Sequence, residues 1–321
     1  MISNPDAAEW DALLAARGHP PSLLQSWGYG QVQQDEGWRV QRVDLGSMAA
    51  SVLLRGPGPH PWGYVPRGPV PASREALSAL VEWARDRHLS GISVEPEAGE
   101  ELIPTLQGLG FGPAAELHPR TTLLVPLAEE DAMLSQLKPK HRYNLRLALR
   151  KGVEVEAGDD AHELHRQSVQ TGVRQGISVP ALAAYQRRLR WLAWCRIYVA
   201  RFEGEALGAI MVARFAGRAY YLFGGSSVSR RELMPSYALQ WRAMLDARAA
   251  GCVDYDLWGS PPGPDPDHRW AGLWQFKSGF GGQLVNYCGA WEMTLDASAA
   301  RLLRTVEPLS RLAARLRRRI G

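Results

Sequence analysis

The chain has 321 residues, of which 45% are hydrophobic, and a formal net charge of +4, so it can bury enough apolar surface for two medium-sized domains. It has no run of about 18 uncharged apolar residues, and residues 1–10 carry acidic rather than basic side chains; we therefore expect a cytoplasmic protein without a signal peptide or membrane span. Its three cysteines (Cys195, Cys252 and Cys288) lie too far apart to indicate a disulfide framework or a zinc site.

The first half of the chain predicts a three-stranded meander followed by a helix and another strand. The meander strands are expected at 38–45, 48–54 and 62–65, the helix at 72–88 and the next strand at 92–95. A helix near 99–107 and a strand at 121–127 complete this half.

The second half repeats this order. Strands are expected at 196–201, 207–214 and 219–223, a helix at 235–250 and a further strand at 253–257. Helices are predicted between the halves at 129–151, 161–176 and 180–191, and a basic helix at 297–319 closes the chain.

The two halves match residue by residue at a few positions, which suggests a duplicated unit. The residues Tyr64, Arg74, Trp83, Gly91 and Glu95 have counterparts in Tyr221, Arg231, Trp241, Gly251 and Asp256. A meander followed by a helix and a strand resembles the GNAT acyltransferase fold. We therefore expect an α+β protein (α/β in the broad sense) with two tandem GNAT-like domains whose mixed sheets are flanked by helices. The domains are expected at 1–135, completed by the closing helix at 296–321, and at 136–295.

The patterns that resemble cofactor or metal motifs lack the neighbouring elements that such sites need. A Gln/Arg-x-x-Gly-x-Gly/Ala pattern occurs at 107–112, 201–206 and 214–219, but none of these segments opens a helix that could hold a pyrophosphate. His162 and His165 share a helical face but have no obvious third ligand. We expect neither acetyl-CoA nor a metal, and no bound cofactor.

Three sequence blocks, in order, resemble the Fem family of peptidoglycan interpeptide-bridge aminoacyltransferases. The first is the basic segment 137–153, which contains Arg142 and Asn144 and ends in Lys-Gly-Val. The second, 220–237, runs from an aromatic strand through Gly-Gly-Ser-Ser to Arg-Arg-Glu-Leu-Met-Pro. The third, 255–289, contains the Phe-Lys-Ser-Gly-Phe run at 276–280.

The resemblance implies a site built on the last two blocks. Lys277, next to Phe276, is the catalytic candidate, because a lysine near an ester carbonyl can stabilise the charge of the tetrahedral intermediate or of the leaving oxygen. Arg231 is expected to bind precursor phosphates, with Tyr237 supporting it. Tyr221 is either a strand aromatic or a substrate contact, and Asp256 either orients Lys277 or an amine, or stabilises a turn.

The function implied by the resemblance is transfer of an amino acid from aminoacyl-tRNA, as co-substrate, to the stem-peptide amine of a lipid-linked or UDP-linked peptidoglycan precursor. Two alternatives remain open. One is a GNAT-like N-acyltransferase that uses another acyl donor on a cell-envelope amine, and the other is a non-catalytic protein that binds RNA or a membrane surface. The basic closing helix adds peripheral contact with the inner membrane face as a further expectation.

Overall fold

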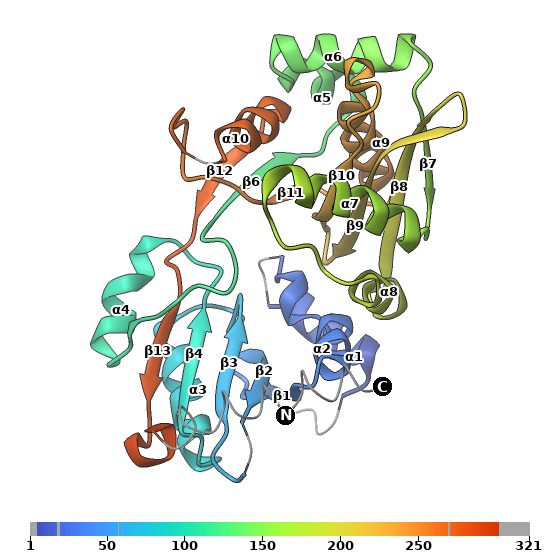
Figure 1. Ribbon diagram of the computed structural model, residues 1–321. Coiled ribbons are helices and arrows are strands. Elements are labelled where there is room, and N and C mark those ends of the chain that lie inside the picture. The colour runs from blue at the N-terminus through green and yellow to red at the C-terminus, as the bar shows by residue number, and fades with distance from the viewer. Residues whose placement is uncertain (1–4, 18–19, 57, 269, 302–321) are drawn as a thin grey trace. The chain divides into compact units, whose positions relative to one another are not determined.

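The computed structural model describes residues 5–17, 20–56, 58–268 and 270–301 (Figure 1). The chain separates into two compact units. The described residues up to His118, with those from Tyr287 onward, form the first unit, and Pro119–Asn286 form the second.

The first unit is a six-stranded mixed sheet, with strand order β1-β2-β3-β4-β13-β5. Its strands are β1 Arg39–Asp44, β2 Ala49–Arg55, β3 Trp62–Pro66, β4 Gly91–Glu95, β5 Gly112–Pro113 and β13 Trp291–Thr294. The first three form an antiparallel meander, and β4 runs parallel to β3. These strands lie where the sequence predicts them, except that β5 and β13 were not expected.

Helix α3 (Arg74–Asp86) connects the two parallel strands β3 and β4. Ser73 caps its N-terminus by accepting a hydrogen bond from the Ala76 amide, and the helix buries Leu77 and Leu80 in the core of the unit. The other helices of the first unit are α1 Ala7–Ala15, η1 Leu23–Gln25, α2 Trp27–Asp35, η2 Glu100–Leu102 and α4 Ile103–Gly108.

The second unit is built on a seven-stranded mixed sheet, with strand order β12-β6-β11-β10-β9-β8-β7. Its strands are β6 Thr121–Pro126, β7 Glu154–Gly158, β8 Trp194–Phe202, β9 Glu205–Phe215, β10 Arg218–Ser226, β11 Asp254–Gly259 and β12 Gln283–Asn286. Strands β8, β9 and β10 form the second meander, and β11 runs parallel to β10. The repeated order of meander, helix and parallel strand, and the expected fold class of two GNAT-like units with mixed sheets and flanking helices, are confirmed.

The helices of the second unit agree with the sequence prediction except near residue 138 and at α10, which was not predicted as a helix. They are α5 Glu130–Gln136, α6 Pro139–Arg150, α7 Ala161–Gln175, α8 Leu182–Trp191, α9 Pro235–Ala249, α10 Ala271–Lys277, and the short η3 Arg231–Leu233 and η4 Ser278–Phe280. The single helix predicted at 129–151 is wrong, because the chain is extended at Leu137 and Lys138. Pro139 disfavours helical backbone at the preceding residue, so α6 has to begin at the proline.

The boundaries of the two units differ from those expected at 135 and 295, because long-range strand pairing sets them. β6 pairs with β11 and β12, which places residues 119–135 in the second unit. β13 pairs with β4, which places residues 287–295 in the first unit. Most of the expected closing helix, residues 302–321, lies outside the described residues.

Candidate active site

Lys277 is a buried lysine at the end of α10. Only 5% of its surface is exposed, and its Nζ donates hydrogen bonds to the carbonyl oxygens of Gly259 (2.6 Å) and Trp258 (3.3 Å). Burial lowers the pKa of the amine to about 8, although the negative charge of Asp256 acts in the opposite direction. Lys277 can therefore change its charge near neutral pH, unlike an ordinary surface lysine.

The two carbonyl groups that bind Lys277 come from an irregular end of β11. Pairing between β11 and β6 shifts register between Asp256 and Gly259, and Trp258 has a left-handed backbone with a φ of 60°. This conformation is uncommon for a bulky residue, and such strained positions often occur at functional sites.

Asp256 holds this irregular turn in place and is itself 3% exposed. Its Oδ1 accepts hydrogen bonds from the Trp258 amide (2.7 Å) and from the Thr122 hydroxyl on β6. Of the two roles left open for Asp256, the structure therefore contains the turn contact, and the carboxylate also acts on Lys277 through its charge.

Tyr221 lies over Lys277 from the neighbouring strand β10. The Nζ atom is 5.5 Å from the centre of the tyrosine ring, a cation–π distance. Burial raises the pKa of the Tyr221 hydroxyl to about 12, so the phenol stays protonated at neutral pH.

A cavity of about 1070 Å³ opens on the other residues of the predicted site. It lies entirely in the second unit, and Tyr221, Arg231, Tyr237 and Phe276 are among the residues that line it. Within the described part of the chain, Lys277 and Asp256 are not among the lining residues. Four of the six predicted residues thus line the cavity, and Tyr221 is the one of these four that also contacts Lys277 through its ring.

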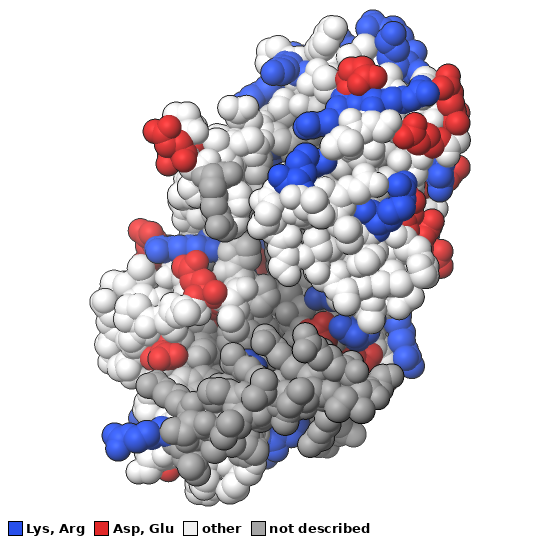
Figure 2. Space-filling model, in the orientation of Figure 1, with Lys and Arg blue, Asp and Glu red and all other residues white. Residues whose placement is uncertain are grey.

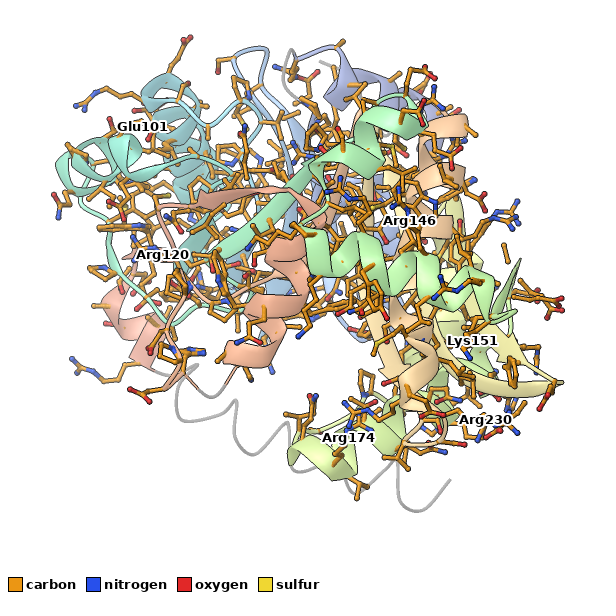
Figure 3. The ribbon with its side chains drawn as sticks, turned by 90° about the horizontal axis from the view of Figure 1, so that it is seen from above. Glu101, Arg120, Arg146, Lys151, Arg174 and Arg230 are labelled. Carbon is orange, nitrogen blue, oxygen red and sulfur yellow. The ribbon has the colours of Figure 1, made fainter. Side chains whose placement is uncertain are left out.

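Arg174 adds a second positive charge to this cavity. Partial burial and the nearby charge of Arg231 lower the pKa of Arg174, so the two guanidinium groups repel each other. Arg174 lies near the end of α7, and its Nη1 donates to the Ser226 carbonyl (3.2 Å) (Figure 3).

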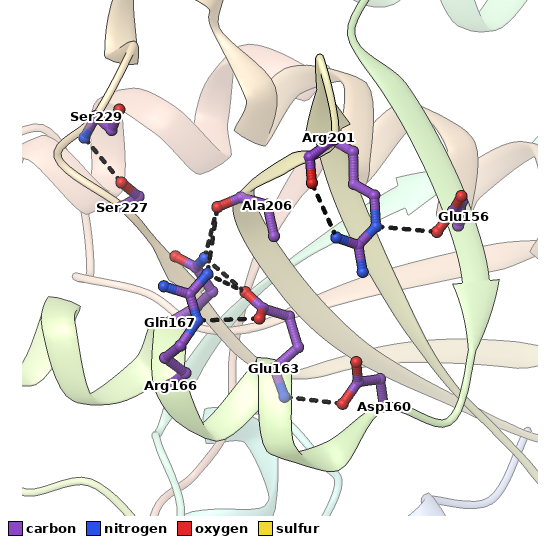
Figure 4. Close-up of polar contacts among 10 residues, drawn as sticks. Glu156, Asp160, Glu163, Arg166, Gln167, Arg201, Ala206, Ser227 and Ser229 are labelled. Carbon is purple, nitrogen blue, oxygen red and sulfur yellow. Dashed lines mark hydrogen bonds and ion pairs between the residues drawn. The ribbon is translucent and has the colours of Figure 1, made fainter.

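The middle of α7 is fixed to β9 by a polar cluster (Figure 4). Arg166 and Gln167 both donate to the Glu163 carboxylate, and the buried Gln167 also donates to the Ala206 carbonyl (2.9 Å). These contacts hold the helix that carries Arg174 against the sheet.

Four aromatic rings pack around the start of the Phe-Lys-Ser-Gly-Phe run. His141 lies 5.0 Å from Tyr237 and 5.2 Å from Phe280 between ring centres, and Tyr237 lies 5.5 Å from Phe276. His141 Nε2 bonds the Phe276 carbonyl oxygen (2.7 Å), and burial lowers the pKa of the imidazole. A neutral ring donating from Nε2 fits this environment.

Gly279 is required by this packing. A Cβ atom at residue 279 would lie 1.9 Å from the His141 ring, so only glycine allows the run to approach so closely.

This chain is similar to known proteins in sequence and in fold. The model of the FemAB family matches residues 200–307, which include Asp256, Lys277 and most of the cavity lining but not Arg174. The similarity to the Fem family is confirmed. "Lipid II:glycine glycyltransferase" of Staphylococcus aureus (strain USA300) is 24% identical to this chain, and the match covers 94% of each protein.

Two solved structures share the fold. The crystal structure of FemX superposes with a TM-score of 0.82 at 22% identity, covering 94% of this chain and 99% of that one. The C-terminal domain of a putative lysylphosphatidylglycerol synthetase from Agrobacterium fabrum gives a TM-score of 0.55 at 15% identity, covering 92% and 97%. Among the described residues no helix combines the length and apolar character needed to cross a membrane.

The sequence prediction missed three residues of this site: Thr122, His141 and Arg174. His141 lies within the first Fem-like block, so its position was a usable signal. Thr122 and Arg174 carry no motif, since only the pairing of β6 with β11 and the placement of α7 bring them to the site.

Proposed function

We propose that this chain is an aminoacyltransferase that moves an amino acid from aminoacyl-tRNA to the stem-peptide amine of a peptidoglycan precursor. The observation that carries the proposal is Lys277. It is a buried amine with a pKa of about 8, held by two carbonyls beside an aromatic and arginine-lined cavity, within the segment that the FemAB model matches.

The chemistry requires little beyond positioning and charge. The amine nitrogen of the acceptor attacks the ester carbonyl, the C–N bond forms, and the ester C–O bond breaks. The amine loses a proton and the departing ribose oxygen gains one. Because the ester is already activated, Lys277 in its protonated form has only to stabilise the developing negative charge on the carbonyl or leaving oxygen.

We place the phosphates of a substrate near Arg231 and Arg174, because these two cations face the same cavity. Tyr221 and Tyr237, which also line this cavity, would contact the apolar part of the substrate. A lipid-linked acceptor is the first choice, since the relatives from Staphylococcus aureus are named for lipid II, and a UDP-linked acceptor is the second. The reaction would take place at the cytoplasmic face of the membrane.

Transfer of label tests this proposal. Purified protein would be given tRNA charged with radiolabelled glycine, alanine or serine, together with lipid-linked or UDP-linked precursor. We expect label on a precursor with one of these donors and none when the tRNA is deacylated first. Label from no charged tRNA, together with transfer from another acyl donor, would instead support the GNAT-like alternative.

A further inference from the structure

The second unit carries a strongly basic helix, α6, whose outward face has no role in the site. The sequence of α6, residues 139–150, contains one lysine and three arginines and no Asp or Glu. Tyr143, Arg146 and Arg150 follow one another at three- and four-residue spacing and so share one exposed stripe of the helix. Figure 2 shows the charges of the second unit in space-filling form, and Figure 3 views α6 from above with Arg146 labelled.

Two large apolar side chains lie exposed among these cations. Tyr143 is 61% exposed and Leu149 is 53% exposed, whereas Leu145 and Ala148 are buried in the core of the unit. The inward face therefore accounts for the folding of α6, and it leaves the outward tyrosine and leucine unexplained.

The cations of this face are not neutralised by neighbouring acids. In the part of the chain that the structure describes, Lys140, Arg146 and Arg150 form no ion pair with a carboxylate. Of the acids on the preceding segment, Glu129 pairs with Arg248 of α9. Arg142, the remaining arginine of α6, donates from Nη1 to the backbone carbonyls of Leu134 and Ser135 and is therefore not counted in this face.

We propose that the α6 face, defined as Lys140, Tyr143, Arg146, Leu149 and Arg150, binds the surface of an anionic lipid bilayer. Lysine and arginine are attracted to anionic headgroups, and a tyrosine and a leucine at the same level can enter the boundary between headgroups and acyl chains. RNA would use the same cations for its phosphates but has no use for an exposed leucine beside them. The lipid surface therefore fits all five side chains.

The beginning of α6 also contacts the Phe-Lys-Ser-Gly-Phe run directly. The Lys138 amide donates to the Gly279 carbonyl (2.9 Å), the Lys138 Nζ donates to the Ser278 hydroxyl (3.1 Å), and His141 binds the Phe276 carbonyl. A bilayer bound to the α6 face would thus hold the segment with Lys277 at a fixed place relative to the lipid surface. The binding itself does not depend on the proposed reaction.

Co-sedimentation of the full chain with lipid vesicles tests the proposal. The vesicles would contain phosphatidylcholine alone or phosphatidylcholine with phosphatidylglycerol. We expect binding only to the anionic vesicles, weakened by added salt. Arg146→Gln with Arg150→Gln should weaken it roughly 25-fold, since each cation near such a surface strengthens binding about fivefold.

The matched control removes the same charge elsewhere. Arg85→Gln with Arg87→Gln changes two exposed arginines of the first unit and should leave vesicle binding within about twofold. The closing Arg-rich segment is present in both double variants, so its contribution cancels. Tyr143→Ser with Leu149→Ser should also weaken binding, by a smaller factor, and an environment-sensitive fluorophore on Leu149→Cys should shift to the blue on anionic vesicles only.

Two results would overturn the proposal. One is equal vesicle binding by the α6 variant and its control, with no fluorophore shift. The other is binding of RNA that depends on Arg146 and Arg150 but not on Leu149, in a protein that ignores anionic vesicles. Vesicle binding is read without any transfer reaction, so failure here and failure of the proposed transferase activity are separate outcomes.

Discussion

The two units place a buried carboxylate at equivalent strands but use it differently. Glu95 ends β4 and Asp256 lies in β11, each on the strand parallel to the last strand of a meander, and both are almost fully buried. Glu95 accepts hydrogen bonds from the Tyr64 hydroxyl (2.7 Å), from His118 Nδ1 (2.9 Å) and from the Leu117 amide (2.6 Å). Burial raises the pKa of Glu95, but these bonds outweigh burial and lower it overall.

Asp256 instead holds a strand irregularity that presents two carbonyls to Lys277. The duplicated fold therefore provides a buried carboxylate in each unit, and what distinguishes the second unit is the added segment of α10 with its lysine. In the first unit the carboxylate fixes the segment that leads out of the unit at His118. The comparison predicts that changes near Asp256 affect transfer, whereas changes near Glu95 affect stability.

Replacing Lys277 should give the largest effect. Lys277→Ala removes the positive charge that is proposed to stabilise the developing oxyanion. We expect turnover to fall roughly 100- to 1000-fold. Transfer assays and circular dichroism would measure turnover and folding. If the variant kept most of its activity, Lys277 would have no part in the reaction. Arg85→Ala, which removes an exposed cation of the first unit, is the control.

Glu95→Gln should mainly destabilise the first unit. The carboxylate receives charge-assisted hydrogen bonds, so we expect a loss of about 2 kcal/mol in the free energy of unfolding, measured in urea. Because the folded pKa of Glu95 is lowered, this stabilisation is present above the ordinary glutamate pKa and is lost as the pH falls through the folded value.

Glu82→Gln, an exposed change on α3, should leave stability unchanged. If Glu95→Gln abolished transfer while unfolding at the same urea concentration as the unaltered protein, Glu95 would have a part in the reaction and the distinction between the units would fail.

Gly279→Ala should disturb the second unit locally. The new methyl group would meet the His141 ring, and we expect a cost of about 1–3 kcal/mol together with reduced transfer. Gly112→Ala in the first unit is the matched control, because a Cβ there meets nothing within 4 Å. Equal thermal stability of the two variants would contradict the close approach of His141.

The smallest expected effect on transfer is a difference between substitutions at two neighbouring threonines of β6. The Thr122 hydroxyl binds Asp256, whereas the Thr121 hydroxyl binds the Ser260 carbonyl. Thr122→Val and Thr121→Val should each cost about 1 kcal/mol of stability. Only Thr122→Val should also lower the rate of transfer, since only Asp256 fixes the turn that positions Lys277, and equal rates would show that the Thr122 bond is merely structural.

Most elements and the neighbourhood of the site followed from the sequence, because hydrophobic periodicity and glycine turns are local signals. The meanders, α3 and α9 lie close to their predicted positions. The resemblance to the Fem family singled out four residues that line one cavity in the structure: Tyr221, Arg231, Tyr237 and Phe276. Their roles, like that of Lys277, stay predictions.

What the sequence missed depends on contacts between distant segments. The unit boundaries follow from pairing of β6 with β11 and of β13 with β4, which local patterns do not encode. The buried amine of Lys277 is bound by two carbonyls at the turn of Trp258 and Gly259. No sequence motif indicates the left-handed backbone of Trp258 at this turn. The break before Pro139 was readable, since proline restricts the residue before it.

The role given to the charge of Lys277 is tested most directly by the pH dependence of single-turnover transfer. With a lysine pKa of about 8, the rate should fall as the pH rises past that value, because the protonated form is lost. Lys277→Arg, which keeps its charge at all these pH values, should lack that fall even if its rate is lower. A rate that stays level or rises through this range in the unaltered protein would contradict the role of the charged lysine.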